Sequence, residues 1–144
     1  NQKLTPLSTH KSYRYLQVVL ISLIEFYQQQ SLNKSDSLAG EFLQLVSQHI
    51  DEKRKVTDYS DMMNLSSDKL TSLCKKYLGT TPLKIIHEEL LLEIKRLLIL
   101  DELSLKEIAY QLNFKSTSNF SSFVKTATKL PPSKLQEELK IKLL

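Results

Sequence analysis

Residues 105–114, LKEIAYQLNF, repeat the pattern of residues 56–65, VTDYSDMMNL, without a gap. Each copy has a small residue, Ser60 or Ala109, then an apolar residue three positions later, then an Asn and another apolar residue. The similarity continues, with one residue added in the second copy, as far as the prolines at 82 and 132. We infer that one supersecondary unit occurs twice in the chain.

Each copy has the pattern of a helix-turn-helix. Asn64 or Asn113 follows the first helix, and Asn tolerates the left-handed conformation that a tight turn needs. Ser66 or Ser116 can then cap a second helix. Its helical spacing predicts Leu70 and Leu73 as the buried stripe of the first unit. The expected core of the second unit consists of Ala109, Leu112, Phe114, Phe120 and Phe123.

The two copies are joined by residues 82–100, PLKIIHEELLLEIKRLLIL, which predict one helix with Pro at its first position. A helix of this length spans about 28 Å. One turn of B-DNA repeats at about 34 Å. A rigid connector of this length could hold the two second helices in successive major grooves on one face of a duplex.

Two more helices are expected upstream. Residues 9–30 keep apolar side chains at three- and four-residue steps, and a second helix should begin at Asp36 or Ser37 and continue to Ile50. We therefore predict an all-α fold with two helix-turn-helix subdomains joined by a long central helix and preceded by two N-terminal helices. The expected domains are 1–36, a leader and linker or dimerisation helix, and 37–144, the DNA-binding domain, with its first helix-turn-helix at about 56–79, connecting helix at about 82–100 and second helix-turn-helix at about 104–128.

The composition agrees with a helical domain. The 144 residues include only 2 Gly and 4 Pro, and 20 basic against 16 acidic side chains give a net charge of +4. The longest apolar stretch, 16–24, is far shorter than the roughly 20 residues that cross a bilayer. Cys74 has no disulfide partner, which favours a reducing, intracellular setting. We expect no metal site and no cofactor, because Cys74, His10, His49 and His87 lack zinc-ligand spacing.

The charge distribution of the second unit favours nucleic acid. From Ile108 to Gln136 the chain has no acidic residue, and it carries Lys115, Lys125, Lys129 and Lys134 beside many Ser and Thr. Such a surface attracts phosphate. A solvated basic face is the plainer alternative, but here the basic residues coincide with the turn and second helix of the repeat.

These residues resemble the DNA-binding domain of the AraC family of bacterial transcription regulators, over about 42–139. The most specific motifs are LSLKEIA at 103–109, SNFSSF at 118–123 and PPS at 131–133. In the first unit, IHEEL at 86–90 matches the family equally well. The resemblance implies a sequence-specific DNA-binding transcription regulator in the bacterial cytoplasm, associated with the nucleoid.

The resemblance also implies DNA contacts. Asn113 and Lys129 stand where the family usually has Gly, and Ser122 stands where an Arg is frequent. Because a hydroxyl cannot make the two hydrogen bonds of a guanidinium, we expect modest intrinsic affinity. The positions implied to face bases are Asp68, Lys69, Thr71, Ser72, Thr117, Ser118, Ser121 and Ser122. Phosphate contacts are expected at the helix N-termini and at nearby lysines, namely Ser66, Lys75, Lys76, Lys115, Ser116 and Lys125.

The N-terminal helix has a separate expected role. Related regulators commonly carry a sensing or dimerising domain ahead of the DNA-binding half, and no such domain fits in this chain, so we expect it to be part of a longer regulator. The helix should pack on that sensor or on its copy in a homodimer, or else fold back on residues 37–50. Its expected contact residues are Tyr13, Leu16, Leu20, Leu23, Ile24 and Tyr27.

Two other classes of function have less support in the sequence. An enzyme is not expected, because Glu88 and Glu89 diverge on a helix, His87 lacks an evident orienting partner, and the chain has no glycine-rich phosphate loop. The alternative is a helical protein-interaction module that docks on RNA polymerase or on a partner regulator. Binding that ignores DNA sequence would mark that alternative.

Overall fold

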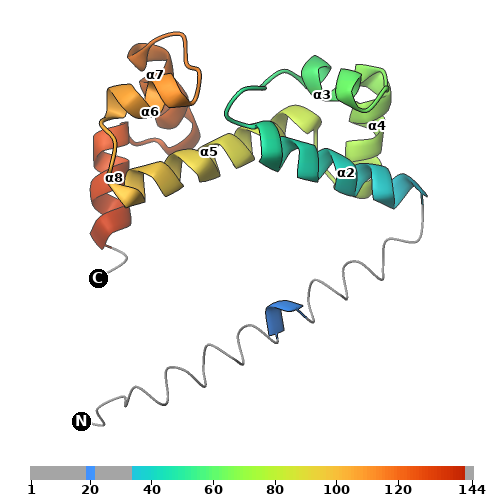
Figure 1. Ribbon diagram of the computed structural model, residues 1–144, viewed down its shortest axis with the longest axis horizontal. Coiled ribbons are helices and arrows are strands. Elements are labelled where there is room, and N and C mark those ends of the chain that lie inside the picture. Colours follow the sequence, from blue (N-terminus) through green and yellow to red (C-terminus); the bar gives the residue numbers. More distant parts are fainter. Residues whose placement is uncertain (1–18, 22–33, 142–144) are drawn as a thin grey trace. The chain divides into compact units, whose positions relative to one another are not determined.

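The structure, a computed structural model, describes residues 19–21 and 34–141. These residues form helices and turns without a strand, which confirms the all-α expectation (Figure 1). No helix in the described part of the chain is long and apolar enough to span a membrane. In chain order the helices are α2 (Lys34–His49), α3 (Val56–Met62), α4 (Ser67–Tyr77), α5 (Pro82–Leu100), α6 (Leu105–Gln111), α7 (Thr117–Thr128) and α8 (Pro132–Ile141).

Contacts divide the chain into two compact parts, an N-terminal part of residues 1–38 and a C-terminal part of residues 39–144. In the N-terminal part the structure describes residues 19–21 and 34–38, all of which are helical. Leu20 is 49% exposed there. The other five residues expected to contact a sensor domain or a second chain lie outside the described residues, namely Tyr13, Leu16, Leu23, Ile24 and Tyr27.

Helix α2 begins earlier than expected. The N-caps predicted at Asp36 and Ser37 are wrong, because the helix already starts at Lys34. Residues 36 and 37 therefore lie inside the first turn of α2 rather than before it. Downstream, Phe42 and Val46 are buried at helical spacing, and the Phe42 ring meets the Tyr59 ring edge-on at 5.8 Å. Helix α2 thus covers the first helix-turn-helix.

Helix α5 has the predicted bounds. The Thr81 hydroxyl caps it by accepting a hydrogen bond from the Lys84 amide, and Pro82 occupies the first turn. Within residues 39–144, Figure 1 shows α5 running from the group formed by α2, α3 and α4 to the group formed by α6, α7 and α8. Its buried side chains are Ile86, Leu90, Ile94, Leu97 and Leu98.

Helix α8, which the sequence analysis did not predict, holds the second group to the end of α5. Gln136 donates hydrogen bonds to the Leu98 carbonyl at 3.0 Å and to a carboxylate oxygen of Asp101 at 2.9 Å. Lys140 pairs with the other oxygen of Asp101 at 2.6 Å. Because these contacts come from one face of α8, they fix the C-terminal helix against the point where α5 ends.

Candidate nucleic-acid interface

The two turns have the same geometry. Asn64 and Asn113 take left-handed backbone conformations with φ of 53° and 54°. In each turn, the amide of the residue after Asn donates a hydrogen bond to the carbonyl of the small residue of the first helix. The Leu65 amide donates to the Ser60 carbonyl at 2.8 Å, and the Phe114 amide donates to the Ala109 carbonyl at 2.9 Å. This pattern satisfies carbonyls at a helix end, and it confirms the predicted helix-turn-helix in both copies.

The small residues allow the two helices of each unit to approach. Ser60 and Ala109 are each only 2% exposed. The Ser60 hydroxyl lies 3.1 Å from the Thr57 carbonyl and 3.2 Å from the Ser67 hydroxyl, so this buried polar group is satisfied. A larger side chain at either position would push the second helix away from the first.

Serine caps fix the start of each second helix. The Ser66 hydroxyl accepts from the Lys69 amide at 3.2 Å, and the Ser116 hydroxyl accepts from the Asn119 amide at 3.1 Å. Both predicted caps are confirmed. The helix N-terminus is also the positive end of the helix dipole, where backbone N–H groups can bind an anion.

The positions expected to face bases lie on the outer sides of α4 and α7. The buried sides are occupied by Leu70 and Cys74 in α4 and by Phe120 and Val124 in α7. Of the eight positions, Thr71 and Ser121 are partly buried and the remaining six are exposed. The six are Asp68, Lys69, Ser72, Thr117, Ser118 and Ser122.

The lysines expected at phosphates are available for an external anion. Lys75, Lys76, Lys115 and Lys125 are exposed, and within the described residues none of them pairs with a carboxylate. Lys134, in contrast, pairs with Glu137 at 2.8 Å. None of these four ammonium groups is neutralised by a carboxylate of the described residues, and that of Lys76 lies 5.0 Å from the centre of the Tyr77 ring.

The predicted core of the second unit needs a correction. Phe114 and Phe123 are only partly buried, and Val124 is fully buried in α7. Both rings also make contacts outside their own unit. The guanidinium of Arg54 lies 4.0 Å from the centre of the Phe114 ring, and the His87 ring meets Phe123 edge-on at 5.5 Å.

Arg54 and the ring contact of His87 were not foreseen. Arg54 belongs to the charged run that follows α2, and such a run is ordinarily solvated. No periodicity or motif distinguishes Arg54 from Lys53 or Lys55. The contact depends on how the α2–α3 connection lies in space, and a local pattern carries no signal of that.

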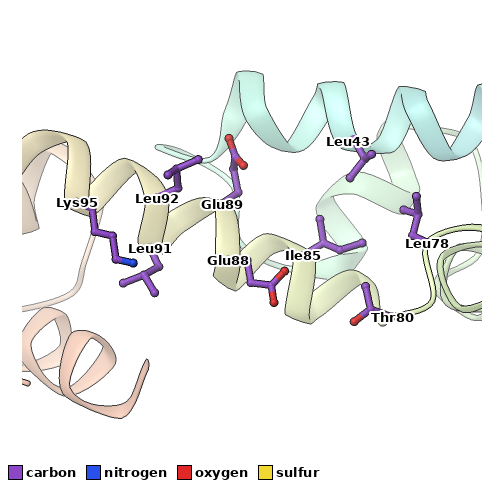
Figure 2. A pocket seen from close by; sticks show the side chains of 9 residues that line it. All are labelled: Leu43, Leu78, Thr80, Ile85, Glu88, Glu89, Leu91, Leu92 and Lys95. Atoms are coloured by element: carbon purple, nitrogen blue, oxygen red, sulfur yellow. The ribbon is translucent and has the colours of Figure 1, made fainter. Parts of the chain in front are cut away.

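Other chemical groups in the described residues give no catalytic arrangement. No cluster of three or more His, Cys, Asp or Glu side chains that could hold a metal occurs there. Burial raises the pKa of Cys74 to about 11, so its thiol is not a nucleophile at neutral pH. A groove along α5 is lined by Leu43, Leu92 and other apolar side chains, and Figure 2 shows Glu88 and Glu89 pointing in different directions within it.

Comparison with known families gives one match. The family described as "Helix-turn-helix domain" matches residues 59–138, which is more than half of the chain. The chain belongs to the AraC-type helix-turn-helix family. The match begins inside α3 and ends inside α8, so it includes both helix-turn-helix units of this AraC-type domain. Comparison with curated protein sequences gave no match.

Solved structures of AraC-type domains have the same fold. An AraC-type transcriptional regulator from Chromobacterium violaceum is 27% identical, with a TM-score of 0.61 over 69% of this chain and 89% of that one. The C-terminal domain of the response regulator yesN from Fusobacterium nucleatum is 25% identical, with a TM-score of 0.60 over 68% and 97%. The DNA-binding domain of AdpA, solved with a target DNA, is 17% identical, with a TM-score of 0.63 over 72% and 93%.

Family and fold together identify this AraC-type chain as a DNA-binding transcription regulator. The expectation of a regulator is confirmed, and the protein-interaction alternative is not favoured. Regulators of this family and fold are typically not enzymes.

Proposed function

We propose that this regulator reads a specific operator by inserting α4 and α7 into successive major grooves of one DNA duplex. The observation that carries the proposal is the continuous helix α5, with 19 residues, between two units whose second helices both present polar, exposed sides. Its length of about 28 Å is close to one turn of B-DNA, which is about 34 Å. The AdpA domain, which has this fold, was solved in complex with a target DNA.

Within this proposal, the outer sides of α4 and α7 face the bases. Short hydroxyl side chains can hydrogen-bond to base edges but cannot make the bidentate contact of an arginine. Specificity should therefore come from several weak contacts rather than one strong one. The proposed base-facing residues are Asp68, Lys69, Thr71 and Ser72 in α4, and Thr117, Ser118, Ser121 and Ser122 in α7.

Phosphate contacts would hold the two helices in place. The N-termini of α4 and α7 bring backbone N–H groups and a positive dipole end toward the duplex. Exposed lysines without a carboxylate partner among the described residues add full charges beside them. The proposed phosphate-contacting residues are Ser66, Lys75, Lys76, Lys115, Ser116 and Lys125.

The remainder of the chain would bring in partners. In this proposal residues 37–144 bind DNA in the bacterial cytoplasm, at the nucleoid, and residues 1–36 contact a sensor domain or the same segment of a second chain. Dimerisation would multiply a modest affinity, because two linked domains bind with a high effective concentration. Contact with RNA polymerase would use a surface that the DNA leaves uncovered.

Selection of bound sequences from a random duplex pool at about 150 mM salt tests the central proposal. We expect an enriched motif with two elements about one helical turn apart. The selected duplex should then be titrated against a scrambled duplex. Binding that ignores sequence would contradict the proposed base reading and would revive the protein-interaction alternative.

Lysine variants test the phosphate contacts. Lys75→Ala or Lys125→Ala should weaken binding to specific and scrambled DNA alike and reduce the slope of log affinity against log salt by about one. Lys84→Ala is the matched control, because Lys84 already lies 3.9 Å from Glu88 on α5. An unchanged slope in both test variants would count against this docking.

Serine and threonine variants test the base contacts. Thr117→Ala or Ser121→Ala should alter preference at particular base pairs, at a cost of roughly 1 to 3 kcal/mol, with binding to scrambled DNA nearly unchanged. Thermal melting of each variant checks that the fold is intact. A uniform loss on all sequences would show that these side chains do not read bases.

A further inference from the structure

The connection between α2 and α3 contacts the turn of the second helix-turn-helix. The Asn113 side-chain amide donates a hydrogen bond to the Asp51 carbonyl at 3.2 Å. Nearby, the Arg54 guanidinium lies 4.0 Å from the centre of the Phe114 ring. Because residues 51–55 lead directly into α3, these contacts join the first unit to the second by a route that does not pass along α5.

The environment of Arg54 is unusual for an arginine. Its Nε and Nη2 atoms are buried, and no hydrogen-bond partner for them occurs among the described residues. Burial also lowers the pKa of the guanidinium, which nevertheless remains charged at any ordinary pH. Withdrawing these two nitrogens from water without a hydrogen bond in return is costly, and among the described residues the face of the Phe114 ring offers the guanidinium an attractive contact.

The Phe114 ring that contacts Arg54 also packs against α7, the second helix of its unit. It lies 5.3 Å from the Phe120 ring and 5.8 Å from the Phe123 ring, both in α7. Phe123 in turn meets His87 of α5 edge-on. A row of aromatic rings therefore connects Arg54 with α7 and with the connecting helix α5. Displacement of the α2–α3 connection should then change the position of α7.

The first unit has no equivalent row. At the positions that correspond to Phe114 and Phe123 it carries Leu65 and Leu73, which cannot attract a cation through a ring face. At these two positions of the repeat, aromatic side chains therefore occur only in the unit that contacts Arg54.

We propose that Arg54 is a positioning residue for DNA recognition, which together with Phe114 fixes the orientation of α7 relative to α4 and so sets the half-site spacing that the regulator accepts. The inference rests on the proposed two-groove function. It adds to that function a residue that touches no base, and it assigns the choice of spacing to a contact between the two units.

The physical reason is geometric. If α5 alone joined the units, small changes in how each unit packs on it would rotate one second helix relative to the other. A second attachment away from the α5 axis opposes that rotation. One added base pair moves a half-site by about 3.4 Å and rotates it by about 34° around the duplex, so a restrained pair of helices should reject it more strongly than a loose pair.

DNA titration provides the first test. The full chain, Arg54→Gln, Phe114→Leu and the control Arg96→Gln are titrated with the selected operator, with operators lengthened or shortened by one base pair between the elements, and with each element alone. Arg96 is a suitable control because it is exposed on α5 and pairs with Glu93 at 2.7 Å, and the substitution removes the same charge.

We expect Arg54→Gln and Phe114→Leu to bind the single elements like the unaltered chain. Their preference for the selected spacing over the shifted ones should fall about threefold to thirtyfold, the range that corresponds to loss of a cation–π contact. Arg96→Gln should keep the full preference. Phe114→Leu removes no charge, so a changed spacing preference in that variant cannot come from a lost phosphate contact.

Two results would overturn the proposal. In the first, both variants keep the spacing preference of the unaltered chain. In the second, Arg54→Gln loses affinity equally for single elements and for all spacings, with a shallower salt slope, which would make Arg54 a phosphate contact. If the unaltered chain shows no preferred spacing, the proposed two-groove function fails instead. The second test then decides whether the contact between Arg54 and Phe114 holds the two units together.

That second test needs no DNA. Spin labels attached through Lys76→Cys in α4 and Thr126→Cys in α7, both exposed positions, report the distance between the units. Cys74 is fully buried and should not take up label. We expect one narrow distance distribution, broadened by Arg54→Gln and unchanged by Arg96→Gln. Distance distributions of equal width in Arg54→Gln and the parent, with equal melting temperatures, would show that the contact between Arg54 and Phe114 does not fix the units, whatever the DNA results.

Discussion

The two helix-turn-helix units share their turns but differ in the side chains that face their neighbours. In the first unit Tyr59 is fully buried, meets Phe42 of α2 and donates a hydrogen bond to the Lys53 carbonyl at 2.8 Å. The corresponding residue of the second unit is Ile108, also fully buried. The repeated pattern therefore determines the turn, whereas the element that covers each unit determines the residues packed against it.

The difference extends to the outer surfaces. The second helix of the first unit has Asp68 in its first turn, while the second unit has no acidic residue from Ile108 to Gln136. An acid near a helix N-terminus stabilises the helix but repels a phosphate placed there. Under the proposed function, the second unit should contribute more of the electrostatic affinity for DNA. The first unit should discriminate more strongly against DNA that places a phosphate next to Asp68.

The largest effect is expected from equivalent core residues. Leu70 and Phe120 occupy the same position of the repeat, and both are fully buried. Phe120→Ala should lower the free energy of unfolding by about 3 to 5 kcal/mol and Leu70→Ala by about 2 to 5 kcal/mol, because each leaves a cavity. Urea denaturation measures both. A loss below about 1 kcal/mol at either position would break the equivalence of the two cores.

Much of this architecture could be predicted because it is encoded locally. Asn at the turn, Ser at the cap and Pro at the first position of α5 each act within a few residues of themselves. Helix α5 has its predicted bounds for that reason. The start of α2 has no such local signal, since Lys34, Ser35 and Asp36 are residue types that suit either a connection or a first helical turn.

The contacts between the units could not be predicted in the same way. Phe114 and Phe123 have the spacing of core residues, and only the three-dimensional arrangement shows that they also contact Arg54 and His87, outside their own unit. Helix α8 was missed because its role depends on Gln136 and Lys140 reaching the end of α5, far away in sequence. For the candidate DNA surface, the exposure of most of the side chains follows from helical spacing alone.

A smaller effect is expected where the two units end their second helices differently. Gly79 and Lys129 both have left-handed conformations, with φ of 69° and 66°. That conformation strains any residue with a Cβ, by roughly 1 to 2 kcal/mol, whereas Gly adopts it freely. We expect Lys129→Gly to raise the free energy of unfolding by about 1 kcal/mol, and Gly79→Lys to lower it by a similar amount.

Both substitutions can be measured by thermal and urea unfolding. A Cβ at Gly79 would meet no atom within 4 Å, so its effect comes from the backbone alone. Gly40→Ala is a useful control, because Gly40 lies in α2, where Ala is favoured by about 0.5 to 1 kcal/mol. If Lys129→Gly destabilises the protein, the Lys129 side chain must contribute more than the strain that its backbone costs.

The smallest effect concerns pH and again separates the units, because Tyr59 titrates and Ile108 does not. Burial, followed by the nearby charges of Asp58, Asp51 and Glu89, raises the pKa of Tyr59 to about 12. An unfolded tyrosine has a pKa of about 10, so the folded state holds this proton more tightly. The resulting stability is complete below pH 10 and is lost as the pH rises toward 12.

Tyr59→Phe removes this contribution together with the hydrogen bond to Lys53, which is worth about 0.5 to 1.5 kcal/mol. We therefore expect Tyr59→Phe to be less stable than the parent at pH 9, and the difference to shrink as the pH is raised above 10, because only the parent loses this contribution. Urea unfolding at several pH values measures it, with Tyr110→Phe as the control, since Tyr110 is 84% exposed. Parallel stability curves for the parent and Tyr59→Phe would mean that folding does not hold the Tyr59 proton more tightly, so that the exchange of Tyr59 for Ile108 between the two units has no consequence for the pH dependence of stability.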